Sequence, residues 1–272
     1  MTKAATLHAL HRNPGILLCG NAWDVGTARL IAHLGFPAIE TSSAGLAFAT
    51  GRPDAEGLIT RTEMLESLGR IAAAVSLPVT ADLENGFGDA PTKVAETIAL
   101  AMAFGLAGGS IEDATGHAEA PNYDIGLAAE RIRAAAEAAD GRFVLTARCD
   151  AYMHGRGELR DVIRRLQAYQ EAGADVLAAP GLPTREDLET MVREVDRPVA
   201  VFVGLSTWQP DLAALTEIGV KRASVGSGLA RAALTGFLSA AREIKESGTF
   251  NQVATAVPFR DLNALFRTLH RG

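Results

Sequence analysis

The sequence predicts an α/β fold, a (β/α)₈ barrel of the TIM type with an additional C-terminal helix. Short apolar runs alternate with longer segments of helical periodicity, which is the pattern of repeated βα units around a parallel sheet. There are eight such runs, the strand number of this barrel. No Pro/Gly/Ser-rich linker divides the 272 residues, so we expect one barrel domain.

The eight apolar runs define the predicted strands, which in chain order are 15–24, 37–43, 77–86, 108–114, 142–150, 175–181, 197–204 and 221–228. Several of the helical segments between them have recognisable ends. Thr60 and Glu63 have the spacing of a capping box, and Gly35, Gly105 and Gly173 stand where helices should end. We therefore predict a barrel domain over residues 1–248 and a helical extension over residues 249–272.

The extension carries an apolar stripe at helical spacing, formed by Phe259, Leu262, Leu265, Phe266 and Leu269. A barrel has already closed its core by this point of the chain. The helix therefore needs another surface, either the flank of its own barrel or a neighbouring subunit. Both remain open, and we expect a homo-oligomer, a dimer or a tetramer.

Composition excludes several classes of protein. Hydrophobic residues make up 48% of the chain and charged residues 21%, which is ordinary for a globular protein with a large core. The net charge of -6, with Lys and Arg scattered, argues against nucleic acid as a partner. No apolar run has the length of a membrane span, and the N-terminus lacks signal-peptide features, so we expect no membrane association and a cytoplasmic protein. Cys19 and Cys149 are far apart, which favours buried thiols in a reducing compartment.

Acidic residues gather where the first strands of the barrel end. The carboxyl ends of the strands form the working face of such a barrel. The polar residues there are Glu40, Ser42, Ser43, Asp82, Glu84, Glu112, Asp113, Arg148 and Asp150, with Asp54 in the loop after the second run. Carboxylates at a desolvated opening raise each other's pKa unless a cation neutralises them. An oxygen-only ligand set suits Mg²⁺, or Mn²⁺, better than zinc; the alternative is that these acids cap the following helices.

Other polar residues near the predicted opening suggest further roles. The guanidinium of Arg148 can hold a carboxylate or phosphate at two points, or form a salt bridge with Glu112 or Asp150. His117 lies in a polar loop after the fourth run, where it is either catalytic or only solvated. Schiff-base chemistry is disfavoured, because none of the lysines, Lys3, Lys93, Lys221 and Lys245, falls at the end of a predicted strand.

Four segments, quoted in chain order, resemble the isocitrate lyase/phosphoenolpyruvate mutase superfamily over nearly the whole chain. "NAWDVGTARLIAHLGFPAIETSSAGLAFATGRPD" is similar to the opening of that family, and "LPVTADLENGFGD" to its metal-binding DxDxGYG segment. "GGSIEDATG" resembles its IED turn, and "FVLTARCDAY" its ARTDA strand. The resemblance implies a barrel enzyme that stabilises a pyruvate enolate, and family members commonly assemble as tetramers with an exchanged C-terminal helix.

Carried over by position, the resemblance implies roles for particular residues. Asp82 would bind Mg²⁺, with Glu84 and Glu112 helping directly or through water and Asp54 in the outer shell. Arg148 would hold the carboxylate of a small-molecule substrate. The segment Ser43, Ala44, Gly45 and Leu46 would supply backbone and hydroxyl donors to the same group.

The chain also departs from the family pattern. The loop "IEDATGHAEAPNYD" has neither the cysteine of the family's lyases nor the lysine of its phosphonomutases, and "VFVGLSTW" lacks the glutamate of the lyases' NxTEFG segment. His117 and Tyr123 are the candidates for proton transfer, and Asn122 is a candidate for substrate binding. Glu84 replaces the family's usual aspartate.

The leading hypothesis from the sequence is a Mg²⁺-dependent lyase that cleaves a C–C bond of a small 2-oxo or 2-hydroxy carboxylate through a pyruvate-type enolate. The alternatives are a C–P enzyme, either a phosphonopyruvate hydrolase or a phosphoenolpyruvate mutase, and a non-catalytic binding protein on the same scaffold. A sugar-phosphate enzyme with a phosphate site at "VGLS" and "VGSGLAR" would leave the acidic cluster unexplained.

Overall fold

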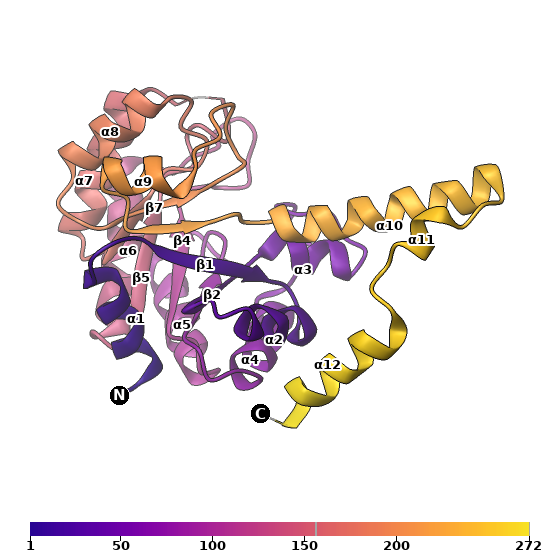
Figure 1. Ribbon diagram of the computed structural model, residues 1–272. Coiled ribbons are helices and arrows are strands. Elements are labelled where there is room, and N and C mark those ends of the chain that lie inside the picture. The colour runs from indigo at the N-terminus through magenta and orange to yellow at the C-terminus, as the bar shows by residue number, and fades with distance from the viewer. Residues whose placement is uncertain (156, 272) are drawn as a thin grey trace.

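The computed structural model describes residues 1–155 and 157–271, and within these residues eight parallel strands close into a barrel in chain order, β1 to β8 (Figure 1). The predicted fold class is therefore confirmed. Each strand lies inside one of the eight predicted runs: β1 (Leu17–Ala22), β2 (Ala38–Thr41), β3 (Val79–Asp82), β4 (Gly108–Glu112), β5 (Val144–Arg148), β6 (Val176–Ala178), β7 (Val199–Phe202) and β8 (Arg222–Ser224).

Helices follow the strands and surround the barrel: α2 (Val25–His33), α3 (Ser43–Ala49), α4 (Arg61–Ala73), α5 (Pro91–Ala103), α6 (Ile125–Ala139), α7 (Leu159–Glu171), α8 (Arg185–Glu194) and α9 (Leu212–Ile218). The predicted capping box is present at α4, where the Thr60 and Glu63 side chains each accept a hydrogen bond from the other residue's backbone N–H. Gly35, Gly105 and Gly173 have positive φ just after helices, a conformation that glycine adopts without strain.

The strand register brings the polar strand ends to one rim. Glu112 of β4 lies beside Arg148 of β5, and Asp82 of β3 lies beside Ser110 of β4. Because all strands are parallel, their carboxyl ends meet at the same end of the barrel. Residues predicted from separate runs of the sequence thus become neighbours across the hydrogen-bonded strands.

The other end of the barrel is closed by α1 (Lys3–Arg12), a helix that the sequence analysis did not single out. Its Leu7 is fully buried in a cluster with Leu17, Val144 and Val176. A Cβ on Gly108 would lie 2.8 Å from the Val144 carbonyl oxygen and 2.9 Å from Leu7, which explains why glycine stands at the start of β4. The amino end is therefore packed with apolar side chains, and the carboxyl end is left for a site.

The last three helices leave the barrel. α10 (Gly228–Ser247) projects away from it and has one buried residue, Ala230, while α11 (Asn251–Ala254) turns the chain back (Figure 1). α12 (Phe259–Arg271) returns toward α2, where Phe266 lies beside Gly26 and Arg29 hydrogen-bonds His270 at 3.4 Å. Across the three helices and their links the exposed large apolar residues are Leu229, Leu234, Phe237, Leu238, Ile244, Phe250, Val253, Val257, Phe259 and Leu262.

Both cysteines are free and buried, as predicted. Of the helices in the described ranges, none is both long and apolar enough to cross a membrane.

Candidate active site

A pocket of about 950 Å³ opens at the carboxyl ends of the strands. It is lined by residues of β2, β3, β4, β5 and β7 and of the loops that follow these strands and β8. Its acidic lining residues are Glu40, Asp54, Glu56, Asp82, Glu84, Glu112 and Asp150. The acids expected at the strand ends thus share one cavity.

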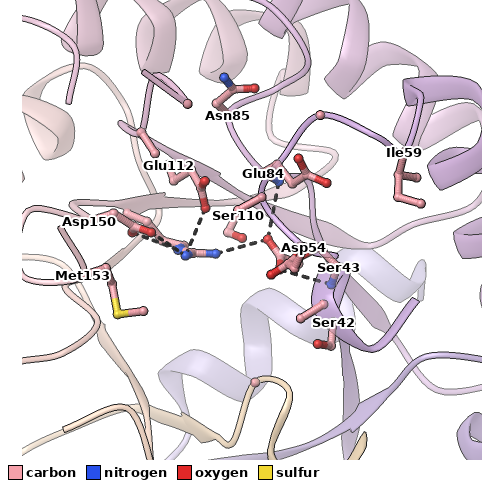
Figure 2. Close-up of a pocket in the computed structure, with 18 of the residues that line it drawn as sticks. Ser42, Ser43, Asp54, Ile59, Glu84, Asn85, Ser110, Glu112, Asp150 and Met153 are labelled. Atoms are coloured by element: carbon pink, nitrogen blue, oxygen red, sulfur yellow. Dashed lines mark hydrogen bonds and ion pairs between the residues drawn. The ribbon is translucent and has the colours of Figure 1, made fainter. Parts of the chain in front are cut away.

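Arg148 lies at the centre of these acids and forms ion pairs with three of them. Its Nη1 is 3.1 Å from Asp82, and its Nη2 is 3.0 Å from Glu112 and 2.7 Å from Asp150. Its Nε donates a second hydrogen bond to Asp150 at 3.2 Å, so this contact is two-pronged. Figure 2 shows the labelled Glu112 and Asp150 on one side of these dashed contacts and Asp54 on the other.

Asp82 is held from the neighbouring strand as well as by Arg148. Its Oδ2 accepts a hydrogen bond of 2.6 Å from the Ser43 hydroxyl, and its backbone N–H donates to the Thr41 hydroxyl at 3.1 Å. The Ser43 backbone N–H also donates to Asp82 Oδ2, at 3.3 Å. Ser43 therefore holds one of the predicted metal ligands, which is a more specific role than the donor to substrate that the resemblance implied.

Asp82 and Glu84 both line the pocket, although β3 ends at Asp82. Residues two positions apart on a strand point to the same face, and just beyond the strand end the chain turns at Glu84, which has a left-handed backbone with φ of 49°. Its carbonyl accepts a hydrogen bond from Glu112 N–H at 3.0 Å, which fixes the turn against β4. Burial, and then the charges of Asp82 and Asp54, raise the pKa of Glu84 to about 7.

Glu112 and Asp54, which also line the pocket, have raised pKa values as well. Burial and the neighbouring Asp150 raise the pKa of Glu112 well above its usual value, although Arg148 opposes this effect. Burial and the charge of Asp82 raise the pKa of Asp54. One guanidinium thus does not neutralise this set of acids, and a further cation would stabilise their ionised forms.

The residues fit a hard divalent cation by their chemistry, although they are not arranged as a finished metal site. Asp54, Asp82, Glu84 and Glu112 offer only oxygen donors, which suits Mg²⁺ or Mn²⁺. Within the described ranges, no three His, Cys, Asp or Glu side chains are grouped in metal-binding geometry. Arg148 instead pairs with Asp82 and Glu112.

A buried aspartate behind the pocket locks β4 to β5. Asp113 accepts hydrogen bonds at 2.8 Å from the Asn122 side chain and from the Asp150 backbone, at 3.2 Å from Arg165 and at 2.7 Å from Tyr169. These contacts hold the segment on which Asp150 and Arg148 lie. The sequence analysis placed Asp113 at a strand end but gave it no role.

The structure brings some of the predicted site residues together and separates others. Asp54, Asp82, Glu84, Glu112, Ser43, Ala44 and Arg148 all line the pocket. Gly45 and Leu46 are instead buried within α3. The exposed His117 is not among the residues that line the pocket, whereas its neighbours Thr115 and Gly116 are.

Asn122 and Tyr123 are also turned away from the pocket. Asn122 donates to Asp113, and the Tyr123 hydroxyl donates to Asp89 at 2.6 Å. Burial and this hydrogen bond raise the pKa of Tyr123 to about 12. In this conformation neither side chain is placed to meet a ligand.

The pocket wall also contains Ser110 and His154, which the sequence did not single out, and Glu40, which it placed at a strand end without a role. Strand alternation supports the position of Glu40, because it lies two residues before Ser42 and so faces the same side of β2. The salt bridge expected between Arg148 and Asp150 is present. Nothing in the local sequence distinguishes His154 from a solvated loop histidine.

The eight parallel strands form a closed barrel, and an acidic pocket around one arginine opens at their carboxyl ends. These two features define the protein as a (β/α)₈ barrel with an enzyme-type site. A family model described as phosphoenolpyruvate phosphomutase matches residues 7–245, and the chain belongs to this family. This confirms the resemblance noted in the sequence.

The relatives include lyases and decarboxylases. An oxaloacetate decarboxylase of Rhodopseudomonas palustris is 30% identical over 264 residues, covering 88% of this chain and 90% of that protein. The structure of 2,3-dimethylmalate lyase, a phosphoenolpyruvate mutase/isocitrate lyase superfamily member, is 25% identical with a TM-score of 0.86, covering 98% of this chain and 94% of the other. A Burkholderia cenocepacia protein with a provisional lyase/mutase assignment is 51% identical, with a TM-score of 0.94 and coverage of 97% and 95%. The chain is thus an enzyme of a lyase/mutase superfamily.

Proposed function

We propose that the protein is a Mg²⁺-dependent lyase that cleaves a C–C bond of a small 2-oxo or 2-hydroxy carboxylate and leaves a pyruvate-type enolate. The observation that carries this proposal is the pocket in which Asp54, Asp82, Glu84 and Glu112 surround Arg148. The raised pKa of Glu84, about 7, indicates a place where positive charge is missing. A divalent ion would restore the balance of charge and create a site for an enolate.

The residues divide the work between binding and charge stabilisation. Asp82, Glu84 and Glu112 would hold Mg²⁺, with Asp54 behind them and Ser43 fixing Asp82. When bound, the ion supplies positive charge to the developing enolate oxygen. Arg148 would exchange part of its contacts with Glu112 and Asp150 for the substrate carboxylate, because a guanidinium binds carboxylates in the same two-pronged way.

Thermal unfolding of metal-stripped protein tests this proposal. Mg²⁺ and oxalate, an enolate mimic, are added separately and together to wild type, to Asp82→Ala and to the exposed-site control Glu137→Gln. Ligands that bind the folded state raise the midpoint, and saturation at about 100 times Kd corresponds to about 2.7 kcal/mol. We expect a shift in wild type and control but not in Asp82→Ala. No shift in wild type with the combined ligands would overturn the proposal.

C–P chemistry is the second candidate, and the family description favours it. Phosphonopyruvate incubated with enzyme and Mg²⁺ can be followed by phosphorus NMR. Release of inorganic phosphate indicates a hydrolase, and formation of phosphoenolpyruvate indicates a mutase. An unchanged spectrum, together with oxalate binding, supports the C–C lyase.

We also propose that a second copy of the chain covers α10. Apolar residues such as Phe237, which is 68% exposed, lie along a helix that packs little on its own barrel. A contiguous apolar surface of this kind is typical of an interface between subunits. The expected assembly is a homodimer or homotetramer.

A further inference from the structure

An ion pair lies inside the barrel, deeper than the Arg148 cluster. Glu40 of β2 and Arg222 of β8 face each other with 3.6 Å between Oε1 and Nη2, and their side chains are 3% and 1% exposed. Arg222 also donates to the Thr146 hydroxyl at 3.1 Å. Thr146 lies two residues before Arg148 on β5, so the pair occupies the inward-facing layer next below the carboxylates of the pocket rim.

This ion pair is incompletely satisfied. Four buried atoms have no hydrogen-bond partner among the residues that the structure describes: Glu40 Oε2, Arg222 Nε, Arg222 Nη1 and the neighbouring Ser224 Oγ. Buried polar atoms without partners destabilise a fold, and apolar residues of similar size are often at least as stabilising as a buried ion pair. Stability therefore does not explain why two charges stand in the centre of the barrel.

Glu40 differs from the acids assigned to Arg148 or to the proposed metal in that its partner, Arg222, lies below the pocket rim. It lines the cavity, as they do. Asp82, Glu112 and Asp150 are bonded to Arg148, while Asp54 and Glu84 belong to the proposed metal set. The 3.6 Å contact of Glu40 Oε1 with Arg222 is longer than a hydrogen bond, so Arg222 holds this carboxylate by charge. A carboxylate that lines a substrate pocket and is held only by charge can accept a proton from the ligand above it.

We propose that Glu40 accepts the proton of a substrate hydroxyl during C–C cleavage, with Arg222 as its positioning residue. This inference rests on the proposed function and narrows its substrate class to acids that carry a hydroxyl on one of the two carbons of the breaking bond. The O–H proton passes to the Glu40 carboxylate, the O–H electron pair forms the new C=O bond, and the C–C bond breaks. The electron pair of that bond becomes the enolate, which then takes up one proton at carbon, so that atoms and charge balance.

Two hydroxy acids serve as probes, each with Mg²⁺ and with pyruvate release as the readout. 4-Hydroxy-2-oxobutyrate gives formaldehyde and the enolate of pyruvate, whereas 2,3-dimethylmalate gives pyruvate as the carbonyl product and the enolate of propionate. We expect wild type to cleave at least one of them and Glu40→Gln to lose about 100-fold or more in kcat with little change in KM, which is the usual range for loss of a general base. Glu40→Gln should keep the thermal shift with Mg²⁺ and oxalate, because oxalate has no hydroxyl proton to give. The matched control is Glu130→Gln, on the exposed face of α6, which should keep full kcat.

Each result supports or overturns the inference. It is wrong if Glu40→Gln keeps kcat within a few-fold of wild type, or if wild type binds Mg²⁺ with oxalate and leaves both hydroxy acids intact. Absence of the oxalate shift in wild type is instead a failure of the proposed function. If Glu40→Gln does not fold, the double variant Glu40→Leu/Arg222→Met removes both charges together. This variant should fold and bind oxalate with Mg²⁺, but it should not cleave either hydroxy acid. An active double variant would show that the ion pair is only structural.

Discussion

Removal of Arg148 should destabilise the protein to a degree that depends on pH. Arg148→Met keeps most of the side-chain volume but leaves Asp82, Glu112 and Asp150 without the guanidinium that lies within 3.1 Å of each. The Arg148 side chain is only 14% exposed, so solvent does not replace it. Breaking a buried ion pair by removing one partner costs about 3–5 kcal/mol, and we expect a loss in this range near pH 8.

The pH dependence separates electrostatics from packing. Burial raises the pKa of Glu112 in the folded protein while Arg148 lowers it, so the variant should raise it further. A carboxyl group whose pKa is higher in the folded than in the unfolded protein destabilises the fold least at low pH. Its cost to the unfolding free energy grows as the pH rises toward the pKa of the folded state. The difference between variant and wild type should therefore shrink by about 1 kcal/mol or more between pH 8 and pH 5.5.

Urea unfolding of both proteins at the two pH values, without metal, measures this difference. Arg142→Met, which replaces a largely exposed arginine on the loop before β5, serves as the control and should change the unfolding free energy by less than about 0.5 kcal/mol. A loss for Arg148→Met that is the same at both pH values would refute the electrostatic account. Packing would then be the cause.

Three further predictions concern other parts of the molecule. Burial, and then the charge of Arg222, lower the pKa of His11 to about 3, so the folded state resists protonation of this side chain. The contribution of His11 to the unfolding free energy is therefore fully present above a pH of about 6.5, and it falls by about 2 kcal/mol from pH 7.5 to pH 5. His11→Gln should flatten this pH dependence in urea unfolding, whereas exposed His33→Gln should not, and equal slopes would contradict the assignment. Asp113→Asn should lower the unfolding free energy by about 3 kcal/mol, because the hydrogen bonds that Arg165 and Tyr169 donate to Asp113 lose the carboxylate charge. A loss below about 1 kcal/mol in urea unfolding would argue against the proposal that Asp113 holds β4 and β5 together. Phe237→Glu should reduce the mass found by light scattering while the far-UV circular dichroism stays unchanged, and an unaltered mass would mean that α10 is not in the interface.

Much of the site could be predicted from short segments because strand ends in a parallel barrel converge. Asp82, Glu112 and Arg148 follow apolar runs, and the closed barrel brings them together whatever the details of the loops. The positions of side chains in the segment from Ala114 to Asp124 could not be predicted in this way. His117, Asn122 and Tyr123 have the right chemistry for the site, but loop conformation decides where they point, and Asp113 and Asp89 hold two of them elsewhere.

The pair of Glu40 and Arg222 shows why other residues could not be assigned. The two residues are 182 positions apart, and although Glu40 lies within the first family-like segment, nothing in that segment marks it as the partner of Arg222. Strand alternation can say that each faces inward, but only closure of β8 on β1 sets both in the same interior. The direction of α10 could not be predicted either. Its helical pattern is compatible both with packing on its own barrel and with projecting away from it.

The sequence by itself determined the barrel, its eight strands and the gathering of acids at one rim, because hydrophobic periodicity is local and the carboxyl ends of parallel strands always share a face. The tertiary structure alone decided that Arg148 pairs with three of those acids at once, that Glu84 has a left-handed backbone and that Glu40 faces Arg222 beneath the pocket. These features depend on distances between segments remote in the chain and on a left-handed turn. Neither is set by local propensity, since the energy of a buried charge depends on what the whole fold places around it.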